Sequence, residues 1–170
     1  MTVKISDYRR REVRRSQRKQ EEPDLGVLSS RTLFSLQREL FATLAEQGHP
    51  GLRPRHGAVL AYLDDDGSRA TDLAAHSGQH KQVIGTLVDE LVELGYVERQ
   101  PDPADRRAKL IVPTAKGRDH MAKSDAILAS MEAAHARAVG EQAYADFKRV
   151  FKLVAERQTS GGAAADPPAS

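Results

Sequence analysis

The segment that most constrains this fold runs from Glu98 to Gly117, where a proline-rich basic loop separates two short apolar runs. Aromatic and β-branched residues, which favour strands, lie on both sides of the loop. Because proline lacks an amide donor and fixes its own φ, Pro101–Asp105 cannot continue a regular ladder. The segment is therefore predicted to form a β-hairpin. Its exposed cations would be Arg106 and Arg107 at the tip and Lys109 on the returning strand.

Basic residues are in excess on this hairpin. Between Glu98 and Arg118 the chain carries six basic residues against three acidic ones. Cations on a narrow, protruding hairpin can reach a phosphate or a minor groove without the body of the protein following. The alternative is a solvated hairpin whose arginines only keep the chain soluble.

Two helical patterns precede the hairpin. Leu73 and Ala74 belong to a short first helix, which Ser77 and Gly78 end. Gly95 stands where a left-handed residue is expected to end the second helix. The second helix is marked by apolar residues at steps of three and four: Val83, Ile84, Leu87, Val88, Leu91 and Leu94. A short helix, a glycine turn and a longer amphipathic helix can place the second helix in a major groove.

The start of the second helix is the candidate for reading DNA. With Val83, Ile84 and Leu87 facing inward, hydrogen-bonding side chains and one glycine remain outside. These residues are His80, Lys81, Gln82, Gly85 and Thr86. The alternative is an ordinary polar helix face, but a helix-turn-helix followed at once by a basic hairpin favours DNA binding.

This succession resembles the MarR (multiple antibiotic resistance regulator) family of transcriptional regulators. The resemblance extends from about Leu52 to Gly117. It is carried by Asp72-Leu73-Ala74, Lys81–Ile84, Leu87–Leu91, Leu94–Arg99, the wing signature Asp105-x-Arg107 and Thr114-x-x-Gly117. The family implies a mostly α (α+β) fold, a winged helix-turn-helix with flanking helices that form a dimerisation platform.

The resemblance also implies roles for single residues. Asp105 would brace the wing, Arg106 or Arg107 would enter the minor groove, and the helix beginning near His80 would read the major groove. Three positions depart from the family pattern. His80 stands where Ser or Thr often caps, Gly85 and Thr86 where a serine and an arginine are common, and Pro113 where a leucine is often seen. These departures affect the operator sequence more than the fold.

The chain divides into five segments. We expect a basic amino-terminal arm at 1–27, a dimerisation helix at 28–51, the winged domain at 52–117, dimerisation helices at 118–158 and a disordered tail at 159–170. The first 22 residues hold eight Lys and Arg against four Asp and Glu, so the high pI reflects the arm. The arm could follow the DNA backbone, or it could be a disordered or crystal-packed tail.

Amphipathic helices flank the winged domain on both sides. A helix beginning near Ser29 carries one apolar stripe, and a glycine break at Gly140 precedes another on the last helix. A winged domain does not need these helices to cover its own core, so they are predicted to form a homodimer. The predicted dimerisation residues are Leu33, Leu40, Tyr144, Phe147, Phe151 and Val154. The alternative is that the helices pack back on their own subunit.

A dimer would place two recognition helices in successive major grooves roughly 34 Å apart, on a pseudo-palindromic duplex operator. The resemblance implies a cleft between platform and winged lobe for small lipophilic or aromatic ligands. The candidate ligand-binding residues are Arg55, His56 and Tyr62, on a helix starting near Pro54. Each of them could instead be a helix-surface or satisfied core residue. A ligand that changes the separation of the lobes would exclude DNA, as in a repressor.

Other chemistry finds little support in the sequence. His76 and His80 are four residues apart, but Gly78 should break a shared helix, so we expect no metal site. Asp64–Gly67 lacks the spacing and the closing glutamate of a calcium loop and should be the turn that ends the helix starting near Pro54. The chain has no cysteine for thiol sensing.

We expect no cofactor, no catalytic residues and no enzymatic activity, because the chain holds neither a nucleophile elbow nor a phosphate-binding glycine loop. Without an apolar run of membrane-spanning length or a signal peptide, we expect a cytoplasmic protein. The competing hypothesis is a winged-helix protein-interaction module that does not bind DNA.

Overall fold

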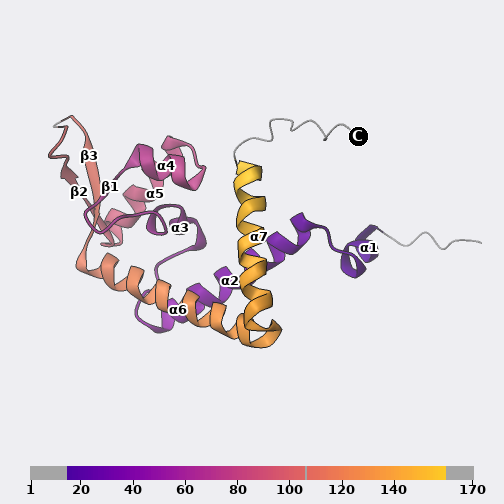
Figure 1. Cartoon of the computed structure of the whole chain (residues 1–170). Coiled ribbons are helices and arrows are strands. Elements are labelled where there is room, and N and C mark those ends of the chain that lie inside the picture. Colours follow the sequence, from indigo (N-terminus) through magenta and orange to yellow (C-terminus); the bar gives the residue numbers. More distant parts are fainter. Residues whose placement is uncertain (1–14, 106, 160–170) are drawn as a thin grey trace, which may run out of the picture.

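The computed structural model describes residues 15–105 and 107–159. Helices dominate it, and one small sheet is present in this part of the chain (Figure 1). In chain order the elements are α1 (Arg15–Glu21), α2 (Leu25–Glu46), the 3₁₀ helix η1 (Pro54–His56), α3 (Gly57–Leu60), β1 (Ser68–Arg69), α4 (Ala70–Ser77), α5 (Lys81–Glu93), β2 (Val97–Pro101), β3 (Lys109–Pro113), α6 (Ala115–Val139) and α7 (Glu141–Thr159). The predicted mostly helical winged helix-turn-helix is confirmed.

The winged lobe is built on the antiparallel sheet β1-β3-β2. β1 pairs Ser68 with Ile111, and β2 pairs Val97 with Pro113 and Pro101 with Lys109. The hairpin strands are thus longer than the apolar runs alone predicted, because Pro101 occupies the last position of β2, where a missing amide is tolerated. The hairpin tip is correspondingly short.

One apolar core holds η1, α3, α4, α5 and the sheet together. Its fully buried members include Val59, Leu73, Ile84 and Leu91. Ile84, Leu87, Val88 and Leu91 form the inward stripe of α5, as the periodicity predicted. Val83 is the exception, since 42% of its surface is exposed. The prediction that it faces inward was wrong, because at 100° per residue Val83 falls on the flank of the stripe that Ile84 and Leu87 define.

Two helices differ from their predicted extents. α2 begins at Leu25 instead of near Ser29, because Asp24 caps it and accepts a hydrogen bond from the Val27 amide at 2.9 Å. The helix predicted to start near Pro54 is only a 3₁₀ turn followed by the four residues of α3. It ends before the acidic turn at Asp64–Gly67, where Gly67 has φ +97°.

The long helix α6 connects the winged lobe to α7. Gly140, with φ +98°, separates α6 from α7 as the sequence predicted. In Figure 1 α6 runs along the base of the molecule, and α7 rises from its far end, apart from the sheet and α4. None of the described residues of α7 is buried. None of the described helices combines the length and the apolar character that a bilayer-spanning segment requires.

The wing and α6 meet in a tight joint. Thr114 caps α6 by accepting from the Gly117 amide at 3.1 Å, and its hydroxyl donates to the Gly95 carbonyl at 2.7 Å. Gly117 is buried against the Tyr96 carbonyl, so close that a Cβ built there would lie 2.1 Å from that oxygen. Lys116 also packs on Tyr96, with its ammonium nitrogen 4.3 Å from the centre of the Tyr96 ring.

A largely buried polar cluster at the same place joins α6 to the segments that follow α2 and precede β2. His49, which is 3% exposed, bonds through Nδ1 to the Tyr96 hydroxyl and through Nε2 to Asp119, both at 3.0 Å. The His120 ring lies edge-on to both His49 and Tyr96. Burial lowers the pKa of His120 to about 4, assisted by the nearby His49. His120 is therefore neutral at physiological pH.

Candidate nucleic-acid interface

The first two turns of α5 form an accessible polar surface. His80, Lys81, Gln82 and Thr86 are exposed, and Gly85 is half-buried with no atom close to the position of a Cβ. His80 precedes the helix in extended conformation but makes no capping hydrogen bond with its side chain. The His80 ring is thus available to a ligand, and the helix backbone can be approached closely at Gly85.

The wing projects from the sheet as a hairpin with a braced tip (Figure 1). Asp105 Oδ1 accepts from the Arg107 amide at 3.0 Å, and the Asp105 carbonyl accepts from the Ala108 amide at 2.8 Å. The two bonds form a local turn at the tip. Arg107 and Lys109 are exposed, whereas Arg106 lies outside the described residues.

A second aspartate, which the sequence reasoning missed, ties the wing to the body. Asp102 is 5% exposed and accepts from Arg69 Nε at 2.7 Å, and its other oxygen accepts from the Ala104 amide at 2.8 Å. The Ala104 amide, followed by the Arg69 guanidinium, lowers the pKa of Asp102. Aspartates often bond to the amide two residues on, so an Asx turn was readable from Asp102-Pro103. Its partner Arg69 could not be read from the sequence, because Arg69 lies far from Asp102 in the chain.

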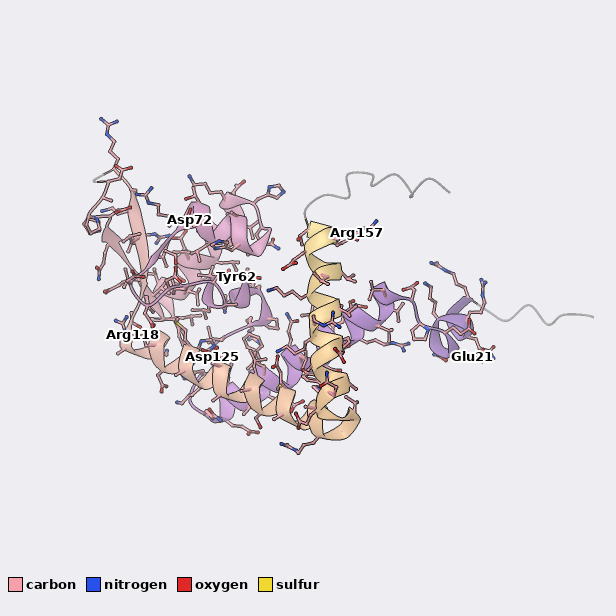
Figure 2. The ribbon with its side chains drawn as sticks, viewed as in Figure 1. Glu21, Tyr62, Asp72, Arg118, Asp125 and Arg157 are labelled. Atoms are coloured by element: carbon pink, nitrogen blue, oxygen red, sulfur yellow. The ribbon has the colours of Figure 1, made fainter. Side chains whose placement is uncertain are left out.

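A cavity of about 860 Å³ lies beneath the interface, between α2, α3, α5 and α6. Arg55 and Tyr62 are among the residues that line it. Tyr62, just after α3, and Asp125, on α6, both line the cavity and are labelled in Figure 2. His56 is not among the lining residues. It is buried behind them, where its ring accepts from the Arg53 amide at 3.0 Å and bonds to Glu90.

The residues predicted for dimerisation fall into two groups. Leu33 and Leu40 on α2 line the cavity. On α7, Phe147, Phe151 and Val154 are exposed, and the rings of Phe147 and Phe151 stack at 5.5 Å. Tyr144 is half-buried, with its ring 6.2 Å from that of His135. Further large apolar residues are exposed on the same two helices: Leu25, Leu28 and Phe34 on α2, and Val150 and Leu153 on α7.

An exposed helix-turn-helix next to a braced basic wing defines a winged-helix DNA-binding protein. The model of the MarR family matches residues 51–108. The match covers the winged lobe, and together with the structural similarities below it shows that the chain resembles transcription regulators of the MarR family. No curated protein matches the chain significantly.

Similar solved structures span most of the chain. CouR from Rhodococcus jostii RHA1, bound to p-coumaroyl-CoA, is 29% identical with a TM-score of 0.63, over 78% of this chain and 92% of that one. A MarR-family transcriptional regulator from Rhodococcus sp. RHA1 is 28% identical with a TM-score of 0.62, over the same shares. CouR bound to a 23-mer DNA duplex, at 24% identity and a TM-score of 0.65 over 81% of this chain and 95% of that one, shares the fold.

Proposed function

We propose that the protein is a homodimeric repressor that binds a near-palindromic duplex and leaves it when a small molecule enters the cavity. The observation that carries the proposal is the pairing, in one lobe, of the accessible start of α5 with the wing that Asp102 and Asp105 brace. α5 would read base edges in the major groove while Arg107 contacts the backbone or the minor groove.

The dimer is inferred from α7. Its apolar residues Phe147, Val150, Phe151 and Val154 lie exposed at helical spacing, although α7 already packs on α6. Such a stripe is characteristic of an association surface. A two-fold axis through this surface would relate two α5 helices, and their separation of roughly 34 Å would match one turn of DNA.

The first experiment is selection of bound duplexes from a random pool with the purified full-length chain. A palindromic consensus with half-sites one helical turn apart would support DNA reading by a dimer. Enrichment of no sequence, with no duplex bound at low ionic strength, would contradict the proposal and favour the protein-interaction module.

Replacing Arg107 by alanine is expected to weaken binding to all duplexes similarly. The slope of log Kobs against log salt should fall by roughly one unit, because one phosphate contact is lost. Fluorescence anisotropy over a salt series measures the slope. Arg149→Ala on α7 is the matched control, since Arg149 is an exposed arginine far from the wing in the chain. An unchanged slope in Arg107→Ala would remove Arg107 from the interface.

Charge introduced into the α7 stripe is expected to separate the subunits. The double variant Phe147→Asp and Phe151→Asp should sediment as a monomer, because an interface cannot bury unpaired carboxylates cheaply. Its affinity for the selected palindrome should drop at least about tenfold, while affinity for a single half-site stays near that of the parent. Ala145→Asp, on another face of the same helix, is the control. A dimeric double variant would show that the interface lies elsewhere.

A further inference from the structure

The outer part of the wing has little support from the sheet. β1 contributes only Ser68 and Arg69, and Arg69 pairs with Leu110 near the start of β3. After Arg69 the chain turns into α4, so the wing continues as a ribbon of two strands with a tip between Pro101 and Lys109 (Figure 1). Ribbons of two strands twist more than larger sheets and are marginally stable alone. The direction of the tip therefore depends on the contacts that hold it to the body of the lobe.

One ion pair holds the tip to the body. Arg69 donates through Nε to Asp102 Oδ2 at 2.7 Å, and its Nη2 lies 2.5 Å from the same oxygen. Among the described residues, no other side-chain hydrogen bond or ion pair joins the tip to the rest of the lobe. The Asp102 side chain is buried, so the loss of Arg69 would leave its charge without a partner.

This ion pair is connected to the exposed cation of the wing. The Asp102 carbonyl accepts from the Asp105 amide at 3.2 Å, and the Asp105 carboxylate accepts from the Arg107 amide at 3.0 Å. Consecutive bonds thus lead from Arg69 through the two aspartates to Arg107. Arg69 directly precedes α4, but its side chain makes no capping bond to that helix. The guanidinium binds the wing instead of the helix that it precedes.

We propose that Arg69 is a positioning residue for DNA binding, which fixes the direction of the wing through Asp102 and so decides where Arg107 meets the duplex. The inference rests on the proposed function in taking the wing as a DNA contact. A wing whose direction is fixed before binding loses little conformational freedom when it binds. Without Arg69 the wing would sample several directions, and only a fraction of the molecules would present Arg107 to the duplex.

The test is a double-mutant cycle on the full-length chain, with the selected duplex and fluorescence anisotropy as the readout. Arg69→Met is expected to weaken binding at least about fivefold. Arg107→Ala should weaken binding of the parent about three- to tenfold but that of Arg69→Met less than about twofold, because the wing no longer presents Arg107. Arg69→Lys should restore part of the affinity, since an ammonium group still pairs with Asp102.

The cycle separates positioning from a loss of stability. A variant that is only less stable would show the full effect of Arg107→Ala, because its folded molecules bind as the parent does. Arg99→Gln is the matched control, since it removes the ion pair of Arg99 with Asp89, in which both side chains are exposed and which joins β2 to α5. In this control Arg107→Ala should keep its effect. The same effect of Arg107→Ala in the parent and in Arg69→Met would overturn the proposal.

A second comparison separates positioning from charge. If Arg69 acted only by neutralising Asp102, then Asp102→Asn would restore the affinity of Arg69→Met, because the tip would no longer repel phosphates. Positioning predicts that the variant with both changes binds as weakly as Arg69→Met alone. Restored binding would therefore overturn the proposal.

The direction of the wing can also be measured without DNA. The chain has no cysteine, so nitroxide labels on Ala104→Cys in the tip and Glu93→Cys at the end of α5, both exposed positions, report one distance by pulsed electron resonance. The parent should give one narrow distance distribution and Arg69→Met a broad one. An equally narrow distribution in both would overturn the inference. A protein that bound no duplex but showed the broadening would disprove the proposed function while Arg69 still fixed the wing.

Discussion

Gly117→Ala is expected to destabilise the protein by more than about 3 kcal/mol, a large share of the roughly 5–15 kcal/mol that is typical of a folded domain. Helix propensity alone predicts the opposite, a gain of up to about 1 kcal/mol for alanine over glycine inside α6. The clash outweighs that gain, because the new Cβ would lie 2.1 Å from the Tyr96 carbonyl oxygen and 3.3 Å from Pro113. The Tyr96 carbonyl belongs to the backbone just before β2, which cannot give way as a flexible side chain can.

Urea unfolding at equal protein concentration measures this effect. Gly57→Ala is the matched control, since Gly57 is also helical but no atom lies within 4 Å of the place that a Cβ would take there. The control should be neutral or slightly stabilising. If the urea midpoint of Gly117→Ala were close to that of the parent, the wing and α6 could move apart without loss of unfolding free energy.

Acid is expected to weaken the folded state before most carboxylates are protonated. His120 has a folded pKa of about 4 and an ordinary value of 6.5, so between these values the unfolded chain binds a proton that the folded chain refuses. The contribution of His120 to the free energy of unfolding is therefore constant above about pH 6.5 and falls as the pH drops toward 4. The total loss is about 3 kcal/mol.

His120→Gln and His120→Leu should flatten this part of the pH profile, because neither side chain binds a proton. The slope of unfolding free energy between pH 4 and 6.5, from urea titrations, is the measurement. Both variants are compared with the parent by slope, so a constant loss of stability from altered packing does not affect the result. Below about pH 4 the parent and the variants should decline alike as Asp102 and Asp119, whose pKa values are also lowered, become protonated. A parent-like slope in both variants would refute the assignment to His120.

The fold was predictable from the chain wherever local periodicity and turn chemistry agree. Gly78 and Gly95 have φ of +67° and +78°, and each lies at the end of a helix that the apolar spacing predicted. α3 was overestimated, because an apolar stretch following Pro54 looks like a helix start and the sequence does not reveal how early the turn comes. Val83 was assigned to the inward face of α5, although at 100° per residue it falls on the flank of the stripe that Ile84 and Leu87 define.

The exposed residues of the candidate site were predictable from the sequence, but the ion pairs that hold the site in place were not. His80 to Gln82 and Arg107 follow from motif and polarity, whereas the pairing of Asp102 with Arg69 and of Glu90 with Arg55 depends on how distant segments meet. The sequence shows which charged residues are present, but the tertiary contacts decide which of these residues form ion pairs. The assignment of Arg55, His56 and Tyr62 as ligand-binding residues stays a prediction, although two of the three lie at the cavity.

The 25 residues of α6 form one rod about 38 Å long, locked at its start into the base of the wing and carrying α7 at its end. Because α6 is long, a small change in its angle at the wing moves its far end by a larger distance than any residue near the wing. A tilt of about 5° near Gly117 would carry the far end through roughly 3 Å, several times the range of about 0.5 Å over which a hydrogen bond to a base keeps its length. In the proposed dimer, a tilt of this size between the winged lobe and α6 would therefore change the spacing between the two α5 helices.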